Sequence, residues 1–168
     1  MTEFQVLYER YAPDVRRFAL YLSGDPAIAD DITSETFVRA WTAPGPLRAE
    51  TVKAYLFTIA RNLYRDTLRR ARRHAVLDES IPDESASAES RAEDRSQLGL
   101  VMAEIQKLTE IDRAALLMRA QEQMSYQEIA RALGLTVAVI KVRIHRARLK
   151  LVRSTRLVDA RRSGLETP

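Results

Sequence analysis

Residues 124–151, MSYQEIARALGLTVAVIKVRIHRARLKL, contain two helix starts that are separated by a single glycine. Ser125 has Glu128 three residues later, a spacing at which the two side chains can cap each other's free backbone N–H groups. Gly134 permits the sharp turn that ends this short helix. Thr136 then offers a hydroxyl cap to a second, longer helix. This stretch predicts a helix-turn-helix.

The second helix of the motif has an apolar face and a basic face. At about 100° per residue, one stripe carries Val137, Ile140, Ile144, Ala147 and Leu151, which predicts the core face. The second helix of such a motif enters the major groove of duplex DNA. The candidates for this contact are Thr136, Ala138, Lys141, Val142, His145, Arg146 and Arg148. A solvated amphipathic helix in a bundle is the alternative interpretation.

The whole chain has the composition of an all-α protein. Its 168 residues include only 5 Gly and 6 Pro, and no long alternating pattern predicts strands. In the N-terminal part we expect helices over about 3–22, with a break or kink at Pro13, over 26–41 after an Asp25 cap, and over 51–73. In the C-terminal part we expect four helices, the first over 97–107 and the second capped by Thr109 with Asp112 three residues on.

Charge is segregated along the chain. Residues 61–73 carry a net charge of +5, residues 78–95 a net charge of −5, and residues 141–162 a net charge of +8. The acidic stretch, rich in Ser and Ala, predicts a flexible linker over residues 75–96, although its second half could be helical. We therefore expect two small helical domains, at 1–74 and 97–168, each with a surface for a polyanion.

Composition argues against several functional classes. There is no cysteine, and His74 and His145 have no metal-ligand spacing around them, so we expect no metal, no cofactor and no enzyme activity. Asp30, Asp31 and Glu35 form a lone acidic cluster, which is usually only solvated. No signal-peptide pattern and no apolar run of ~20 residues occur. We expect a cytoplasmic protein without membrane insertion.

The predicted helix over 51–73 is a second candidate for nucleic-acid binding. An apolar stripe of Val52, Leu56, Ile59 and Leu63 lies opposite a face with Arg61, Arg65, Arg69 and Arg72. Cations beside aromatic side chains suit strands whose bases are exposed, because stacking adds to phosphate attraction. The aromatic residues Tyr55, Phe57 and Tyr64 could equally belong to the core.

Three blocks together resemble the bacterial RNA polymerase sigma factors of the extracytoplasmic-function type. They are ADDITSETFVRAW, AYLFTIARNLYRDTLRR and the residue 124–151 stretch, in the family's order. The resemblance implies a first domain that binds the clamp of core RNA polymerase and melts the minus-ten element of promoter DNA. It implies a second domain that binds the flap and reads the minus-thirty-five element. It also implies a possible anti-sigma factor and a stress or envelope-signal regulon.

Four candidate site residues match the family's motifs by position: Asp31, Glu35, Arg61 and Asn62. The candidates for polymerase binding are Asp31, Ser34, Glu35 and Val38, with Ser34 where the family usually has Gln. The candidates for minus-ten binding are Lys53, Tyr55, Arg61, Asn62, Arg65 and Arg69, and residues 42–51 match the loop that captures a flipped base. In the second helix of the motif, the outward-facing Val142 replaces the family's usual Ser.

Two other functions stay open from the residues alone. A free-standing helix-turn-helix regulator would bind DNA as a dimer without polymerase. A helical adaptor would show no dependence on DNA.

Overall fold

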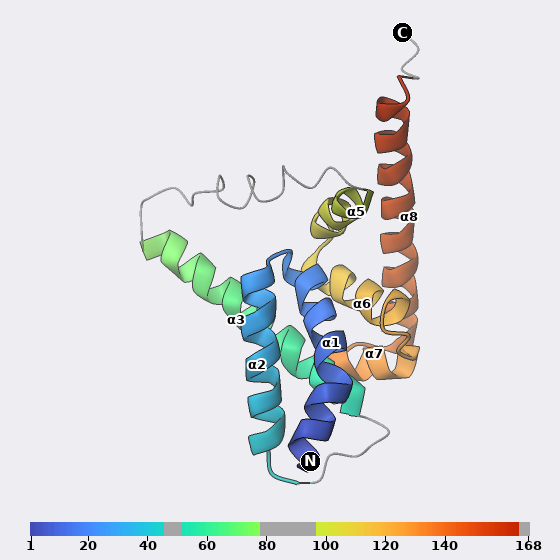
Figure 1. The fold of residues 1–168 in the computed structure, drawn as a ribbon. Helices are drawn as coiled ribbons and strands as arrows, with labels where there is room; N and C mark the ends of the chain where they lie inside the picture. The colour runs from blue at the N-terminus through green and yellow to red at the C-terminus, as the bar shows by residue number, and fades with distance from the viewer. Residues whose placement is uncertain (46–51, 78–96, 165–168) are drawn as a thin grey trace.

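The computed structural model describes residues 1–45, 52–77 and 97–164. Within these ranges the chain forms helices and no strand, which confirms the all-α fold class (Figure 1). The helices are α1 Glu3–Ser23, α2 Pro26–Thr42, α3 Val52–Leu77, α5 Gln97–Gln106, α6 Glu110–Ala120, α7 Tyr126–Leu133 and α8 Val137–Arg162. We call α1–α3 the N-terminal half and α5–α8 the C-terminal half. None of the described helices has the combination of length and hydropathy that a bilayer span requires.

The N-terminal half is a bundle of three helices around an aromatic core. Phe18 of α1 and Phe57 of α3 are fully buried and meet edge to face, with ring centroids 4.7 Å apart. Asp25 caps α2 by accepting from the backbone N–H groups of Ala27 and Ile28, as its position before Pro26 predicts. Phe57 and Tyr64 are both buried, so the core interpretation of these two aromatic residues is confirmed.

Three details of the helices differ from the expectations. Helix α1 continues through Pro13, so the break that the sequence offered as one of two outcomes does not occur. Pro13 lies on the exposed side of α1, where its ring does not disturb the packing of the core. Thr109 accepts from the N–H of Asp112, but the Asp112 carboxylate bonds Arg143 of α8 instead of completing a capping box. Helix α3 ends at Leu77, so residues 75–77 belong to it rather than to the predicted linker.

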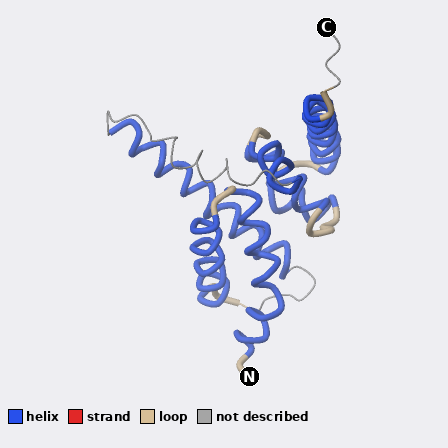
Figure 2. The backbone as a smooth tube through the Cα atoms, turned by 45° about the horizontal axis from the view of Figure 1, so that its top comes forward, coloured by secondary structure: helices blue, strands red, loops and turns tan. Residues whose placement is uncertain are grey.

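The two halves pack against each other. Helix α1 contacts α5 and α6, and α3 contacts α7. Figure 2 shows the two bodies side by side, with the C-terminal ends of α3 and α8 pointing away from them in different directions. Residues 78–96, which make up most of the predicted linker, lie outside the described residues. The division into two domains stays a prediction.

Candidate nucleic-acid interface

The turn between α7 and α8 has the predicted caps. The Ser125 hydroxyl accepts from the N–H of Glu128 at 3.1 Å, and the Glu128 carboxylate accepts from the N–H of Ser125 at 2.8 Å. Gly134 ends α7 in the left-handed conformation, with φ at 67°. The Thr136 hydroxyl then accepts from the N–H of Val139 at 3.3 Å. These local bonds fix the angle at which α8 leaves the motif.

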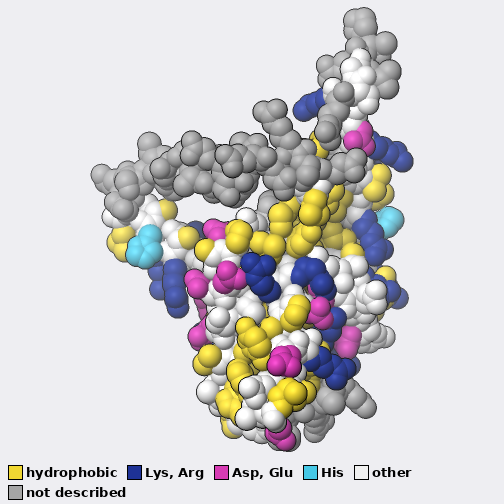
Figure 3. Space-filling model, viewed as in Figure 1, with side chains coloured by type: hydrophobic (Ala, Val, Ile, Leu, Met, Phe, Trp, Pro, Cys, Tyr) yellow, Lys and Arg dark blue, Asp and Glu magenta, His cyan; other side chains and the backbone are white. Residues whose placement is uncertain are grey.

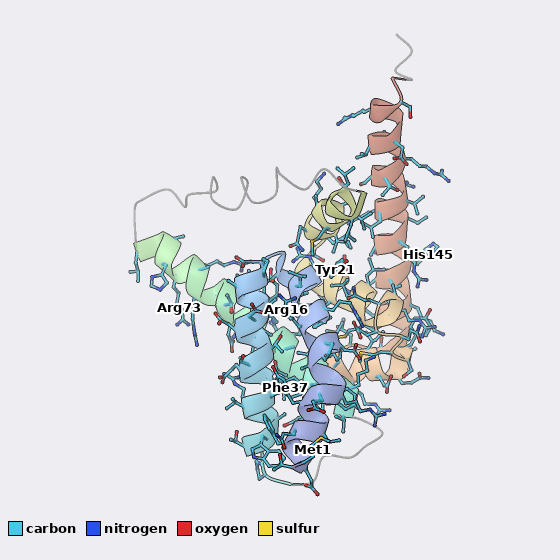
Figure 4. The ribbon with its side chains drawn as sticks, in the orientation of Figure 1. Met1, Arg16, Tyr21, Phe37, Arg73 and His145 are labelled. Carbon is cyan, nitrogen blue, oxygen red and sulfur yellow. The ribbon has the colours of Figure 1, made fainter. Side chains whose placement is uncertain are left out.

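The apolar stripe of α8 is its buried face. Ile140, Ile144 and Ala147 are at most 1% exposed, and Val137 and Leu151 pack against them from the edge of the core. The seven residues proposed for duplex contact are all exposed, and His145 lies on the side of α8 turned away from the other helices (Figure 4). They are Thr136, Ala138, Lys141, Val142, His145, Arg146 and Arg148.

Lys141 has a neighbour that sequence reasoning missed. Its ammonium lies 5.4 Å from the centroid of the Tyr126 ring, and the Arg119 guanidinium lies 4.1 Å from the same centroid. Arg119 is held in turn by the carbonyl of Met124. Both cations are attracted to the ring face, so Tyr126 limits the directions that Lys141 can take. The local sequence carries no signal for this contact.

A groove of about 470 Å³ follows one flank of α8. Its walls combine apolar side chains with cations: Asp112, Ala138, Val139, Val142, Arg143, Arg146 and Lys150. Arg143 donates to the Asp112 carboxylate at 2.8 Å, so its charge is already paired. Arg148 lines a different, mostly apolar groove with Tyr21 and Leu116. The two flanks of α8 therefore present different surfaces.

The six minus-ten candidates of α3 are not all on an open surface. Tyr55, Asn62 and Arg69 are exposed, and Lys53 and Arg65 are half-buried. The sixth, Arg61, is only 6% exposed, and its guanidinium makes two bonds to Glu110 of α6, at 2.8 and 3.1 Å. Only part of this face of α3 is therefore accessible, and the C-terminal half covers Arg61.

The far end of α3 is different. Residues 69–77 are all exposed, and they include Arg69, Arg70, Arg72 and Arg73. Arg73 marks this end in Figure 4, beyond the packed body. Of residues 42–51, the predicted base-capturing loop, residues 46–51 lie outside the described part of the chain.

The polymerase-binding candidates share the outer face of α2. Asp31, Ser34, Glu35 and Val38 are all exposed, whereas Thr33 and Thr36 between them are buried and bond carbonyls one turn back. Glu35 pairs with Arg39 on the same helix, and Asp31 has no ion-pair partner among the described residues.

This face continues into apolar surface that the sequence did not single out. Next to the candidate Val38, which is 53% exposed, Trp41 is 51% exposed and Tyr8 42%. Trp41 meets Phe4 edge to face at 5.3 Å. In Figure 3 hydrophobic side chains gather over the lower part of the α1 and α2 body. A carboxylate face next to exposed aromatic side chains is suited to a partner that is both basic and apolar.

Comparisons with known proteins match both halves. Residues 7–74 match the family described as Sigma-70 region 2, and residues 98–151 match Sigma-70, region 4. The ECF RNA polymerase sigma factor SigL of Mycobacterium tuberculosis is 33% identical over 91% of this chain and 86% of its own length. The sigma factor EcfG of Rhodopseudomonas palustris is 32% identical over 83% of this chain and 77% of its own.

Solved structures share the fold. The sigma factor RpoE of Bartonella quintana, solved with the anti-sigma factor NepR, has a TM-score of 0.75 at 23% identity, covering 93% of this chain and 98% of its own. CnrH, solved with the cytosolic domain of CnrY, has a TM-score of 0.66 at 28% identity, covering 94% and 88%.

A free-standing regulator is not favoured, because the match to region 2 accounts for α1–α3 as well as the helix-turn-helix. Core RNA polymerase and promoter DNA are the partners that these two regions imply. The chain belongs to the ECF sigma factors, which direct bacterial RNA polymerase to initiate transcription at specific promoters.

Proposed function

We propose that the N-terminal half of α8 reads the minus-thirty-five element as duplex DNA. The supporting observation is the division of this helix into a buried apolar stripe and an exposed pole with Val142, His145 and Arg146. An arginine in the major groove can donate to guanine O6 and N7, and a valine can pack on a thymine methyl. Arg148, on the other flank, meets a phosphate rather than a base edge in this proposal.

We propose that the exposed part of α3 binds the minus-ten element after strand separation. Tyr55 offers a ring for stacking, and Asn62 and Arg69 offer donors on the same helix. Stacking and phosphate contacts together bind exposed bases. Lys53 and Arg61 join this surface only when the carboxylates that now pair with them move away.

We propose that the outer face of α2 docks on the clamp of core polymerase through Asp31, Ser34, Glu35 and Val38. The support is their common exposure, together with an Asp31 carboxylate that has no ion-pair partner in the described part of the chain. The C-terminal half then docks on the flap. The protein itself catalyses no reaction in this proposal: it contributes binding energy, and the polymerase makes RNA.

We propose that the protein acts in the cytoplasm, in a stress or envelope-signal regulon, under the control of an anti-sigma factor. The support for the inhibitor is the similarity to CnrH, which was solved with the cytosolic domain of CnrY. A protein that binds this chain and stops transcription with core polymerase would meet this proposal. Failure of every candidate inhibitor encoded beside the gene would count against it.

Run-off transcription with purified core polymerase on a library of promoters tests the function. We expect transcripts from a subset of promoters that core alone ignores. Arg146→Ala should change which promoters respond. Arg161→Ala is the matched control, because Arg161 is an exposed arginine near the other end of α8. The absence of any promoter-dependent transcript with the wild-type chain would contradict the proposal.

A further inference from the structure

Residues from α6, the turn that follows it, α7 and α8 meet around one aromatic ring. Arg119 lies in the last turn of α6, Tyr126 is the first residue of α7, and Lys141 is on the exposed side of α8. The Arg119 guanidinium is 4.1 Å and the Lys141 ammonium 5.4 Å from the centroid of the Tyr126 ring. In the turn, the Met124 carbonyl accepts from Arg119 at 3.0 Å. We call these four residues the ring cluster.

The ring of this cluster is held in place by the fold. Tyr126 directly follows the cap Ser125, whose hydroxyl and N–H are both bonded to Glu128, so the capping box sets the backbone position of Tyr126. The ring is half-buried and packs against the core. Arg119 is half-buried too, and its bond to the carbonyl of the buried Met124 restrains its guanidinium. The ring is therefore a fixed platform beside α8.

Lys141 is the member of the cluster that can reach another molecule. It is exposed and forms no ion pair within the described part of the chain. A lysine ammonium sits on a flexible four-carbon stem, which loses rotational freedom when the ammonium binds an acceptor. Attraction to the ring face already restricts this stem in the free chain, so less freedom remains to be lost on binding.

We propose that Tyr126 is a positioning residue for promoter selectivity, and that it acts through Lys141. The ring holds the ammonium in the orientation in which Lys141 meets the minus-thirty-five element. A restrained ammonium suits one arrangement of base acceptors in the major groove, whereas a freely rotating one reaches the phosphates of any sequence equally well. This role rests on the proposed reading of the minus-thirty-five element by α8, whereas the contact between Tyr126 and Lys141 does not.

Nuclear magnetic resonance of the free chain tests the contact without DNA. The protons next to the Lys141 ammonium should be shifted upfield by the ring face. The chain has only four lysines, so the signal that Lys141→Arg removes identifies them. Tyr126→Leu should return this signal to the position of the other lysines, and the matched control Tyr126→Phe, which keeps a ring face, should leave it shifted. Circular dichroism shows whether the helices persist, and Tyr126→Met replaces Tyr126→Leu if they do not.

Binding of the reconstituted holoenzyme to two dye-labelled promoters tests the positioning role. One promoter is the most active of the library, and the other is the same DNA with a scrambled minus-thirty-five element. The ratio of the two affinities should fall about two- to fivefold in Tyr126→Leu, the strength of a cation–π contact at an exposed site. It should stay at the wild-type value in Tyr126→Phe. In a Lys141→Met background, Tyr126→Leu should change the ratio no further, because the ring then has no ammonium to hold.

The two measurements separate the possible failures. An unshifted Lys141 signal in wild type would overturn the contact. A shifted signal with equal selectivity in wild type and Tyr126→Leu would overturn the positioning role alone. A further loss of selectivity from Tyr126→Leu in the Lys141→Met background would show that Tyr126 acts by a route other than Lys141, which also overturns it. If the wild-type holoenzyme does not distinguish the two promoters, the proposed reading by α8 is wrong and the positioning role fails with it, whatever the resonance signals show.

Discussion

Asp112 of α6 holds Arg143 of α8, with 2.8 Å between the carboxylate oxygen and the guanidinium nitrogen. This bond ties α8 to α6, the helix behind it. Arg143 therefore has an ion-pair partner. Arg146, three residues later on the same helix, has none among the described residues.

The first prediction concerns this pair. Arg143→Ala should lower the free energy of unfolding by about 0.5–1 kcal/mol, because the guanidinium is partly exposed and water screens the attraction. A double-mutant cycle with Asp112→Asn should show a coupling of this size. Chemical denaturation measures it. Additive effects of the two substitutions would show that the pair contributes no coupling.

The second prediction concerns Arg146. Arg146→Ala should cost about 1–3 kcal/mol at the preferred promoter and relax the preference at one base pair. Lys150→Ala or Arg153→Ala should weaken all sequences alike and reduce the salt dependence, as phosphate contacts do. Titrations at several salt concentrations measure both effects. The same pattern in all three variants would show that Arg146 reads no base.

The third prediction concerns Val142, which is 47% exposed in the groove beside Arg146. Val142→Ser removes the methyl groups that can pack on thymine and should shift preference away from thymine at one position. Binding-site selection with both proteins measures the shift. Identical minus-thirty-five preferences would mean that Val142 makes no base contact.

The fourth prediction concerns α2. Asp31→Lys with Glu35→Lys should weaken binding to core polymerase, because it reverses the charge of the proposed docking face. Both side chains are exposed, so the helices should stay folded. Affinity for core measures the loss, and Glu3→Lys with Glu9→Lys, on the exposed side of α1, is the matched control. Equal affinities for both variants would remove this face from the polymerase contact.

The fifth prediction concerns pH. A hydrogen bond from Lys107 lowers the pKa of Glu104 below its ordinary value of 4.5; burial opposes this, and a hydrogen bond from Ser154 of α8 supports it. A carboxylate whose pKa is lower in the folded state stabilises the fold fully when the pH is above its pKa in the unfolded chain. This stabilisation is lost as the pH falls through its pKa in the folded chain. Wild type should therefore lose stability below about pH 4.5 more steeply than Glu104→Gln. Parallel curves of unfolding free energy against pH would contradict it.

Local signals predicted the helices well because they act within one turn. The Ser125–Glu128 capping box, the Asp25 cap and the apolar stripe of α8 each involve residues up to a few positions apart, and all are confirmed. The family match confirmed the sigma factor assignment through blocks of the same local kind.

Contacts between residues far apart in the chain could not be predicted from the sequence. Arg61 and Glu110 are 49 positions apart, and nothing near either residue indicates that they meet. An arginine on the polar face of a helix is normally solvated. The helical periodicity therefore grouped Arg61 with the exposed arginines of α3. The same limit hid the contact between Tyr126 and Lys141, because it depends on how α7 crosses α8.

The exposed end of α3 has a consequence for kinetics. Its last nine residues extend about 13 Å at the rise of an α-helix, and four of them are exposed arginines. That length exceeds the distance of about 8 Å over which physiological salt screens a charge. The charge of this end therefore attracts a polyanion before the polyanion contacts the packed surface. The arginines then affect the association rate more than the dissociation rate of the complex.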